Sequence, residues 1–233
     1  MRINKLNSIL SLLKTPPGRL PHKVCNAIHR RQNRRLDFRY TGESLGPERL
    51  PSSHPDKGAY GHVPTDAAVL SYIFRQSPIA GDDVLVDVGC GKGRVIAWWL
   101  SQGCRNRIIG IEIDGELAAF ARKAFARNDN VDIILGDVNG NLPEAGTLFF
   151  MFNPFNRTVM VAFREKLWEL ALRRSNNSGI GHIGLKLIYY YPVNLDIFTE
   201  DPNWRVTMIK QPWWERLRAQ RMTCAVICPE IGD

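Results

Sequence analysis

Short apolar runs recur along the chain from residue 84 onward, and segments with helical spacing of apolar residues separate the first five of them. Uninterrupted apolar runs are typical of strands that a parallel sheet buries on both faces. The predicted strands are 84–88, 107–114, 131–135, 147–152, 182–190, 204–210 and 222–228. This alternation predicts a doubly wound α/β sheet of seven strands, mostly parallel, whose last two strands form a C-terminal antiparallel hairpin.

Polar residues mark the starts of several predicted helices. Thr65 or Asp66 is placed to cap a helix whose apolar stripe lies within residues 69–74, and Asp114 is placed to cap another. Further helices are predicted over 94–102, 159–174 and 195–199. Helices between successive strands are what the crossovers of a parallel sheet require.

The first predicted strand ends in an acid and three glycines spaced two apart, namely Asp87, Gly89, Gly91 and Gly93. Glycines directly after a buried strand allow positive φ and let a ligand lie against bare backbone. A dinucleotide turn needs a small third residue where this chain has Arg94, which disfavours a site for NAD or FAD. A phosphate loop is excluded because glycine, and not serine or threonine, follows Lys92.

The pattern Asp-x-Gly-x-Gly-x-Gly resembles the first motif of the class I S-adenosylmethionine-dependent methyltransferases. The turn Gly-Cys-Gly-Lys-Gly-Arg is similar to that of uncharacterised bacterial methyltransferases. The resemblance implies a Rossmann-like methyltransferase fold, with S-adenosylmethionine as cofactor and S-adenosylhomocysteine as product. Because the family packs this turn against the methionine part of the cofactor, Cys90 and the three glycines are assigned to cofactor binding together with Asp87.

Acids at the ends of the next two strands extend the candidate cofactor site. Glu112, with its neighbour Ile113, ends the second strand, where a carboxylate is placed to accept both hydroxyls of a ribose. Asp137 follows the third strand at the place where the family has an acid that meets the adenine amino group. A plain turn residue is an open alternative for Asp137.

Tyrosines before the first strand and after the fifth add to the resemblance. The segment from Tyr60 to Thr65 is similar to a Tyr-x-Pro-Thr segment of lysine methyltransferases related to the ATP synthase c-subunit enzyme. That segment covers the cofactor, so Tyr60 and Thr65 are predicted to touch its amino-acid end; a packed tyrosine and a helix cap explain them nearly as well. The run 189–192, Tyr-Tyr-Tyr-Pro, is predicted to wall an acceptor pocket.

The fourth strand delivers Asn153, Pro154 and Phe155 to the edge of the sheet where ligands bind in open α/β folds. This element is similar to the Asn/Asp-Pro-Pro-Tyr/Phe motif of amino-methylating members of the family, but it lacks the second proline. An amide oxygen, a carbonyl positioned by proline and an aromatic face suit an amine acceptor. These three residues are therefore the candidate catalytic residues, Asn153 is also assigned to cofactor binding, and an ordinary Asn-Pro turn is the alternative.

Positive charge is concentrated at the N-terminus. The first forty residues hold ten lysines or arginines and one acid, a net of +9, whereas the whole 233-residue chain carries +8. The near-neutral remainder argues against a dedicated nucleic-acid groove. We predict a basic extension over residues 1–55, partly helical or flexible, and a methyltransferase domain over 56–233. The basic run 30–35 is able to bind nucleic acid, anionic lipid or an acidic partner, but a solvated arm is favoured.

The extreme N-terminus and the cysteines bear on location. Residues 1–14 place apolar side chains on one helical face, which suits peripheral contact with a membrane or docking on the domain. No apolar stretch is long enough to span a bilayer, and no signal-peptide cleavage pattern follows. Five scattered cysteines without a Cys-x-x-Cys pair predict reduced thiols, no metal site and a cytoplasmic protein.

Taken together, these features predict methyl transfer from S-adenosylmethionine to an acceptor, and they favour an amine nitrogen of a protein side chain or small molecule. Two alternatives stay open. One is an RNA methyltransferase that uses the basic extension, and the other is a non-catalytic binding protein with a cofactor fold.

Overall fold

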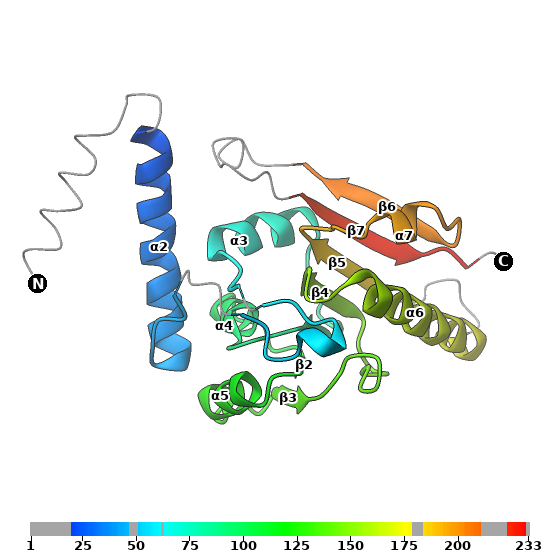
Figure 1. Ribbon diagram of the computed structural model, residues 1–233, viewed down its shortest axis with the longest axis horizontal. Coiled ribbons are helices and arrows are strands. Elements are labelled where there is room, and N and C mark those ends of the chain that lie inside the picture. The colour runs from blue at the N-terminus through cyan, green and yellow to red at the C-terminus, as the bar shows by residue number, and fades with distance from the viewer. Residues whose placement is uncertain (1–19, 47–50, 62, 179–183, 211–222, 232–233) are drawn as a thin grey trace, which may run out of the picture.

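The structure is a computed structural model that describes residues 20–46, 51–61, 63–178, 184–210 and 223–231. Within them a seven-stranded sheet has the order β3-β2-β1-β4-β5-β7-β6 (Figure 1). The strands are β1 (Leu85–Val88), β2 (Ile108–Glu112), β3 (Val131–Leu135), β4 (Leu148–Phe152), β5 (Lys186–Tyr190), β6 (Trp204–Ile209) and β7 (Cys224–Pro229). The first five run parallel, and β7 lies antiparallel between β5 and β6. The predicted fold class is therefore confirmed.

The strand order reverses at β1, which pairs with β2 on one side and with β4 on the other. Val88 at the end of β1 lies level with Ile111 of β2 and Met151 of β4. The residues that follow these three strands therefore emerge at one edge of the sheet. In open α/β sheets this switch point is where a crevice for ligands forms.

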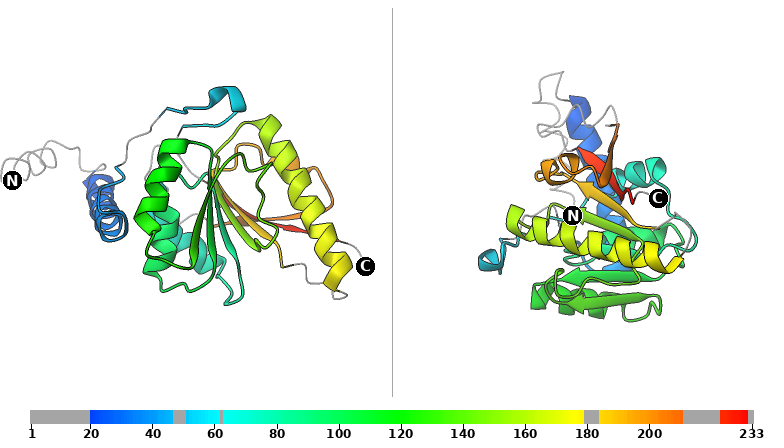
Figure 2. Two further views of the ribbon diagram at one scale, coloured as in Figure 1. Left: turned by 90° about the horizontal axis from the view of Figure 1, so that it is seen from below. Right: turned by 90° about the vertical axis from the view of Figure 1, so that its right-hand side faces the viewer.

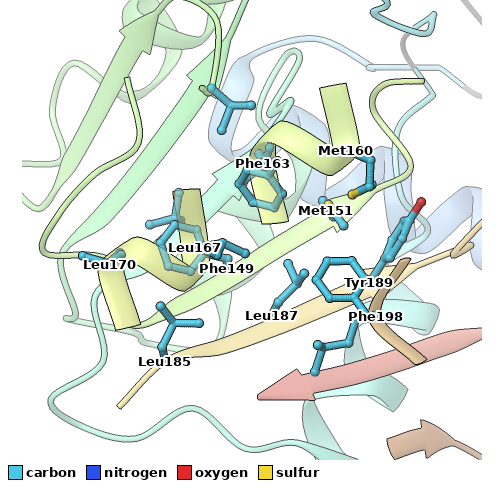
Figure 3. Packing of buried hydrophobic residues seen from close by; sticks show 14 of the residues in the cluster. Phe149, Met151, Met160, Phe163, Leu167, Leu170, Leu185, Leu187, Tyr189 and Phe198 are labelled. Carbon is cyan, nitrogen blue, oxygen red and sulfur yellow. The ribbon is translucent and has the colours of Figure 1, made fainter. Parts of the chain in front are cut away.

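Helices cover both faces of the sheet (Figure 2). On one face lie α3 (Ala67–Gln76), α4 (Arg94–Ser101) and α5 (Gly115–Phe125), and on the other lie α6 (Arg157–Ser178) and α7 (Asp196–Thr199). Figure 3 shows how Met160, Phe163 and Leu167 of α6 pack over Phe149 and Leu187 of the sheet. All five side chains are fully buried, and each such burial contributes about 1.5–3 kcal/mol to stability.

Side-chain caps explain where three of these helices begin. Asp66 accepts the N–H of Ala68 at the start of α3, as predicted for one of its two candidate caps. Asp114 accepts two N–H groups at the start of α5, which also confirms its predicted role. Asn156 accepts the N–H of Val159, so α6 begins two residues earlier than the apolar spacing indicated.

A long helix precedes the sheet. This helix, α2 (Leu20–Thr41), packs against α3, α4 and α5 (Figure 1). Asn33 accepts the N–H of Ala67 at 2.9 Å, and His29 Nδ1 lies 3.2 Å from Asp66 Oδ2. Residues 20–41 are therefore a helix docked on the domain and not a free arm, because one face packs there through Leu36 and Tyr40 as well as polar side chains. The arginines of the basic run 30–35 are exposed to solvent.

Some predictions lie outside the described residues, among them the helix over 1–14 and the start of the predicted fifth strand at 182–183. Among the helices that the structure does describe, none is long and apolar enough to cross a membrane.

Candidate functional site

A pocket opens at the carboxyl ends of the strands, at the switch point between β1 and β4. About 1020 Å³ of space lies between its walls, counting open solvent at its mouth, which suits a small-molecule site. Ten of the predicted site residues line it: Tyr60, Thr65, Asp87, Gly89, Cys90, Glu112, Ile113, Asp137, Pro154 and Phe155. Gly91, Gly93 and Asn153 are next to lining residues in the chain without being part of the wall. Five segments distant in sequence thus meet in one pocket.

The glycine turn has the backbone conformation for which glycine is needed. Gly89, Gly91 and Gly93 have φ values of +72°, +53° and +85°. A Cβ added at Gly89 would lie 2.8 Å from Cβ of Pro154, and one added at Gly93 would meet the ring of Phe125. Glycine is needed at these two positions because Pro154 and Phe125 of α5 leave no room for a side chain.

Glu112 ties the glycine turn to the start of α5. Its Oε2 accepts the N–H of Gly91 at 2.7 Å, and its Oε1 accepts the N–H of Asp114 at 3.0 Å. Burial raises the pKa of Glu112, while the backbone N–H bonds oppose that rise. Each carboxylate oxygen has a second acceptor site, so the carboxylate is able to take ligand hydroxyls in addition.

Asp87 lies at the floor of the pocket with one oxygen unsatisfied. Its Oδ2 is buried and has no hydrogen-bond partner among the described residues. Burial, and then the charge of Glu112, raise the pKa of Asp87 well above its ordinary value. Burial also raises the pKa of the Cys90 thiol, which disfavours a nucleophilic thiolate there.

Asn153 is held by a tyrosine of the next strand. The hydroxyl of Tyr189 donates to Asn153 Oδ1 at 2.9 Å and accepts the N–H of Asn194 at 3.4 Å. Burial raises the pKa of Tyr189 to about 12, so it stays protonated and is able to donate. The sequence predicts the run of tyrosines only as an aromatic wall, because a hydrogen bond between Tyr189 and Asn153 leaves no signal in the sequence.

The other two candidate catalytic residues also make internal contacts. The carbonyl of Pro154 accepts the N–H of Tyr60 at 2.8 Å, and Ala59 forms an isolated antiparallel bridge with Phe155. Phe155 is buried, with its ring edge-on to Phe163 at a centroid distance of 5.6 Å. The segment around Tyr60 and the Asn-Pro-Phe loop therefore form one unit in the wall of the pocket.

Arg94 also belongs to the pocket, although in the sequence it serves only as an argument against a dinucleotide site. It is buried, lines the pocket, and forms a bidentate ion pair with Asp37 of α2 at 2.9 and 2.7 Å. Residues 51–53 also line the pocket, although the predicted boundary assigns them to the extension. Neither contribution was foreseen, because both bring distant N-terminal residues to the site.

The match to known families covers the centre of the chain. Residues 85–176 match the family model described as a methyltransferase domain. The match spans about two fifths of the chain, and over these residues it agrees with the predicted class of S-adenosylmethionine-dependent methyltransferase. The finer resemblance to bacterial proteins with the same turn, and to lysine methyltransferases, stays a prediction.

Solved structures share the fold of this methyltransferase domain. An RNA methyltransferase from Salinibacter ruber, in complex with S-adenosyl-L-homocysteine, is 22% identical, with 73% of this chain and 97% of that chain covered and a TM-score of 0.51. An S-adenosylmethionine-dependent O-methyltransferase from Thermotoga maritima is 17% identical, with 72% and 68% covered and a TM-score of 0.50. At these identities the likeness concerns the fold alone.

A curated relative matches over a shorter stretch. The ribosomal RNA small subunit methyltransferase A of Geobacter sulfurreducens is 31% identical over 74 residues, which is 32% of this chain. The match spans 26% of the relative's own length. The match therefore supports a methyltransferase domain in this chain, but it covers only a part of each of the two proteins.

The pocket fits S-adenosylmethionine on two observations. A buried carboxylate oxygen of Asp87 is unsatisfied by the described residues, and Gly89 and Cys90 at the start of the glycine turn line the pocket beside it. By contrast, the described residues hold no group of three His, Cys, Asp or Glu side chains that is able to bind a metal ion.

Proposed function

We propose that this protein transfers a methyl group from S-adenosylmethionine to a nitrogen acceptor. The observation that carries the proposal is the pocket at the switch point, where Gly89 and Cys90 of the glycine turn, Glu112 and Asp137 line one cavity. In this proposal the glycine turn receives the methionine part, Glu112 accepts the ribose hydroxyls and Asp137 receives the adenine amino group. Bound S-adenosylmethionine supplies a methyl group on a sulfonium, which is already activated for direct transfer.

The chain's own residues align the acceptor and exclude water. Asn153 Oδ1 and the carbonyl of Pro154 each already accept one hydrogen bond, from Tyr189 and from Tyr60. Each oxygen has a second lone pair, with which it would accept an N–H of an amine and so orient the nitrogen lone pair. The segment around Tyr60 would close the mouth of the pocket, because it is bonded to the same loop.

An amine of a protein side chain or small molecule is the acceptor chemistry that these oxygens suit. Two relatives are named as RNA methyltransferases, which is compatible with an RNA nitrogen but does not by itself favour one. A non-catalytic binding protein with the same fold is disfavoured, since Asp87, Glu112 and the three glycines of the turn are all present.

Titration calorimetry with S-adenosylmethionine tests the cofactor site. Gly91→Val should abolish binding, because valine at a φ of +53° distorts the turn that Glu112 holds. Gly103→Val is the matched control: Gly103 also has a positive φ, but it follows α4 away from the pocket, and a Cβ there meets nothing within 4 Å. Equal affinity in wild type and Gly91→Val would contradict the proposed placement.

Mass spectrometry tests the transfer itself. Proteins, RNA and metabolites from a deletion strain are compared with those of the wild type, and a methyl mark should be missing from one of them. Asn153→Ala, reintroduced into the deletion strain, should bind the cofactor but restore the mark only in part. Complete restoration would refute the orienting role of Asn153.

A further inference from the structure

The outer face of α2 is a continuous arginine surface. Five side chains there are exposed, and we call them the arginine face: Arg30, Arg31, Arg34, Arg35 and Arg39. The acid of this helix, Asp37, is fully buried and pairs with Arg94. Among the described residues, no carboxylate forms an ion pair with any of the five guanidinium groups. The face therefore presents uncompensated positive charge.

The arginine face is fixed relative to the cofactor pocket. Asp37 and Arg94 join α2 to the first turn of α4 through two short hydrogen bonds, and Arg94 itself lines the pocket. Beyond the helix, Glu43 pairs with Lys92 of the glycine turn at 3.0 Å. Figure 2 shows α2 lying along the outside of the helical layer, so its outer side faces away from the domain. A partner on this face would be held at a set position relative to the site.

The chemistry of the face suits a nucleic-acid strand. Guanidinium groups bind phosphates through two parallel hydrogen bonds, and neighbours three or four residues apart on a helix lie about 5–6 Å apart. Phe38 lies among them with 47% of its surface exposed, and the guanidinium of Arg34 sits 5.4 Å from its ring centre. An exposed aromatic ring flanked by arginine is a platform on which an unpaired base stacks.

We propose that the arginine face of α2 binds structured RNA at a loop with unpaired bases. The inference rests on the proposed function. It assigns the nitrogen acceptor to RNA, in place of the protein side chain or small molecule that the oxygens of the pocket suit when they are considered alone. A membrane surface fits less well: Val24 and Ile28 are exposed one turn apart near the start of α2, but the exposed Phe38 lies ten residues further on, beyond Arg31, Arg34 and Arg35, so the three do not form one continuous apolar stripe. The near-neutral charge of the remaining chain does not oppose the proposal, because the contact needs only the helix.

Fluorescence anisotropy with the full-length protein and a labelled RNA hairpin with a large loop tests the proposal. The test variant carries Arg31→Gln, Arg34→Gln and Arg35→Gln. The control carries Lys166→Gln, Arg173→Gln and Arg205→Gln, three exposed residues on α6 and β6 that lose the same charge elsewhere. Titrations are run between about 50 and 200 mM salt, because phosphate contacts are read from the salt dependence of binding.

The test variant should bind at least about tenfold more weakly than wild type, and its salt slope should fall by about 2, as expected for three lost contacts with a single strand. The control should match wild type within about twofold. An equal loss in both variants would overturn the proposal, because net charge alone would then explain binding. The proposal would also be overturned if the wild-type protein did not bind the hairpin but sedimented with phosphatidylserine vesicles.

Calorimetry with S-adenosylmethionine on the same preparations separates this inference from the proposed function. The test variant should keep wild-type cofactor affinity, since none of its three substitutions lines the pocket. Cofactor binding without RNA binding would remove the RNA proposal and leave the methyltransferase standing. RNA binding without cofactor binding would remove the proposed function.

Discussion

Asn153 has a backbone φ of +39°, in the left-handed region that residues other than glycine seldom adopt. Such conformations persist where the surrounding structure holds them, and they gather at functional sites. Here the strand end, the following proline and the hydroxyl of Tyr189 hold it. Because the Tyr189 hydroxyl accepts the N–H of Asn194, its own proton is directed to Asn153 Oδ1. Tyr189 thus acts on the acceptor through Asn153 and is a positioning residue.

Tyr189→Phe tests this role. We expect the rate of methyl transfer to the acceptor identified by mass spectrometry to fall about two- to tenfold, the effect of one hydrogen bond. Affinity for S-adenosylmethionine should not change, because the hydroxyl faces Asn153 and not the glycine turn. Tyr72→Phe removes a hydroxyl from α3 and serves as control. A loss of cofactor affinity together with the rate would indicate a merely structural role.

Asp87 gives a pH-dependent stability with a definite sign. Its pKa in the folded protein lies well above the ordinary 3.8, because it is buried and faces Glu112. The folded state then holds this proton more tightly than the unfolded chain. Its contribution to stability is full below about pH 3.8 and is lost as the pH rises through the raised pKa.

Asp87→Asn should therefore flatten the rise of stability toward low pH and make the protein more stable at neutral pH. Urea unfolding at about pH 5 and about pH 8 measures both effects. Some pH dependence of stability should remain, since burial also raises the pKa of Glu112. If the variant and the wild type had the same pH dependence of stability, the pKa of Asp87 would not be raised in the folded protein.

At the scale of elements, a buried ion pair attaches α2 to the domain. Asp37 and Arg94 are both almost fully buried, and Arg94 also donates to the carbonyl of Gly46 at 3.1 Å. A buried pair is weak support for stability as a whole, but removal of one partner leaves a charge without compensation. The pair therefore serves mainly to fix where α2 lies against α4.

Asp37→Ala should lower the free energy of unfolding by about 3–5 kcal/mol, because Arg94 is left buried and unpaired. The double variant with Arg94→Met should recover most of that loss, since it replaces the pair by apolar packing. Urea unfolding measures both. A double variant as unstable as the single one would show that the ion pair, and not the unpaired charge, stabilises the protein.

At the scale of the whole molecule, the pocket depends on the order of the strands. Residues after β1, β2, β3 and β4 lie at one edge only because the sheet is parallel and its order reverses at β1. The N-terminal part of the chain joins the same region twice, through residues 51–53, 59–61 and 63–65 in the pocket wall and through α2, which packs against α3, α4 and α5. A basic extension and a neutral domain in sequence are thus one packed body over the described residues from 20 onward.

Local patterns accounted for a large part of this arrangement. The apolar runs predicted the strands to within a few residues, because a buried parallel strand must be apolar on both faces. The glycines predicted the turn, since their positive φ values suit no other residue well, and Asp66 and Asp114 predicted helix starts through capping. Each of these features depends on a residue's immediate neighbours.

Contacts between distant residues were decided only by the tertiary structure. Arg94 meets a partner 57 positions away, and Tyr189 donates to a residue 36 positions away. Nothing in a basic run indicates that one helical face will dock while the other stays exposed, because that depends on Asp37, Asn33 and His29 finding partners on α3 and α4. The sequence by itself determined the strands of the sheet, the glycine turn and the capped helix starts, since those follow from local spacing. The paired states of Asn153 and Arg94, and the exposure of the arginine face, were set by which surfaces the folded chain brings together.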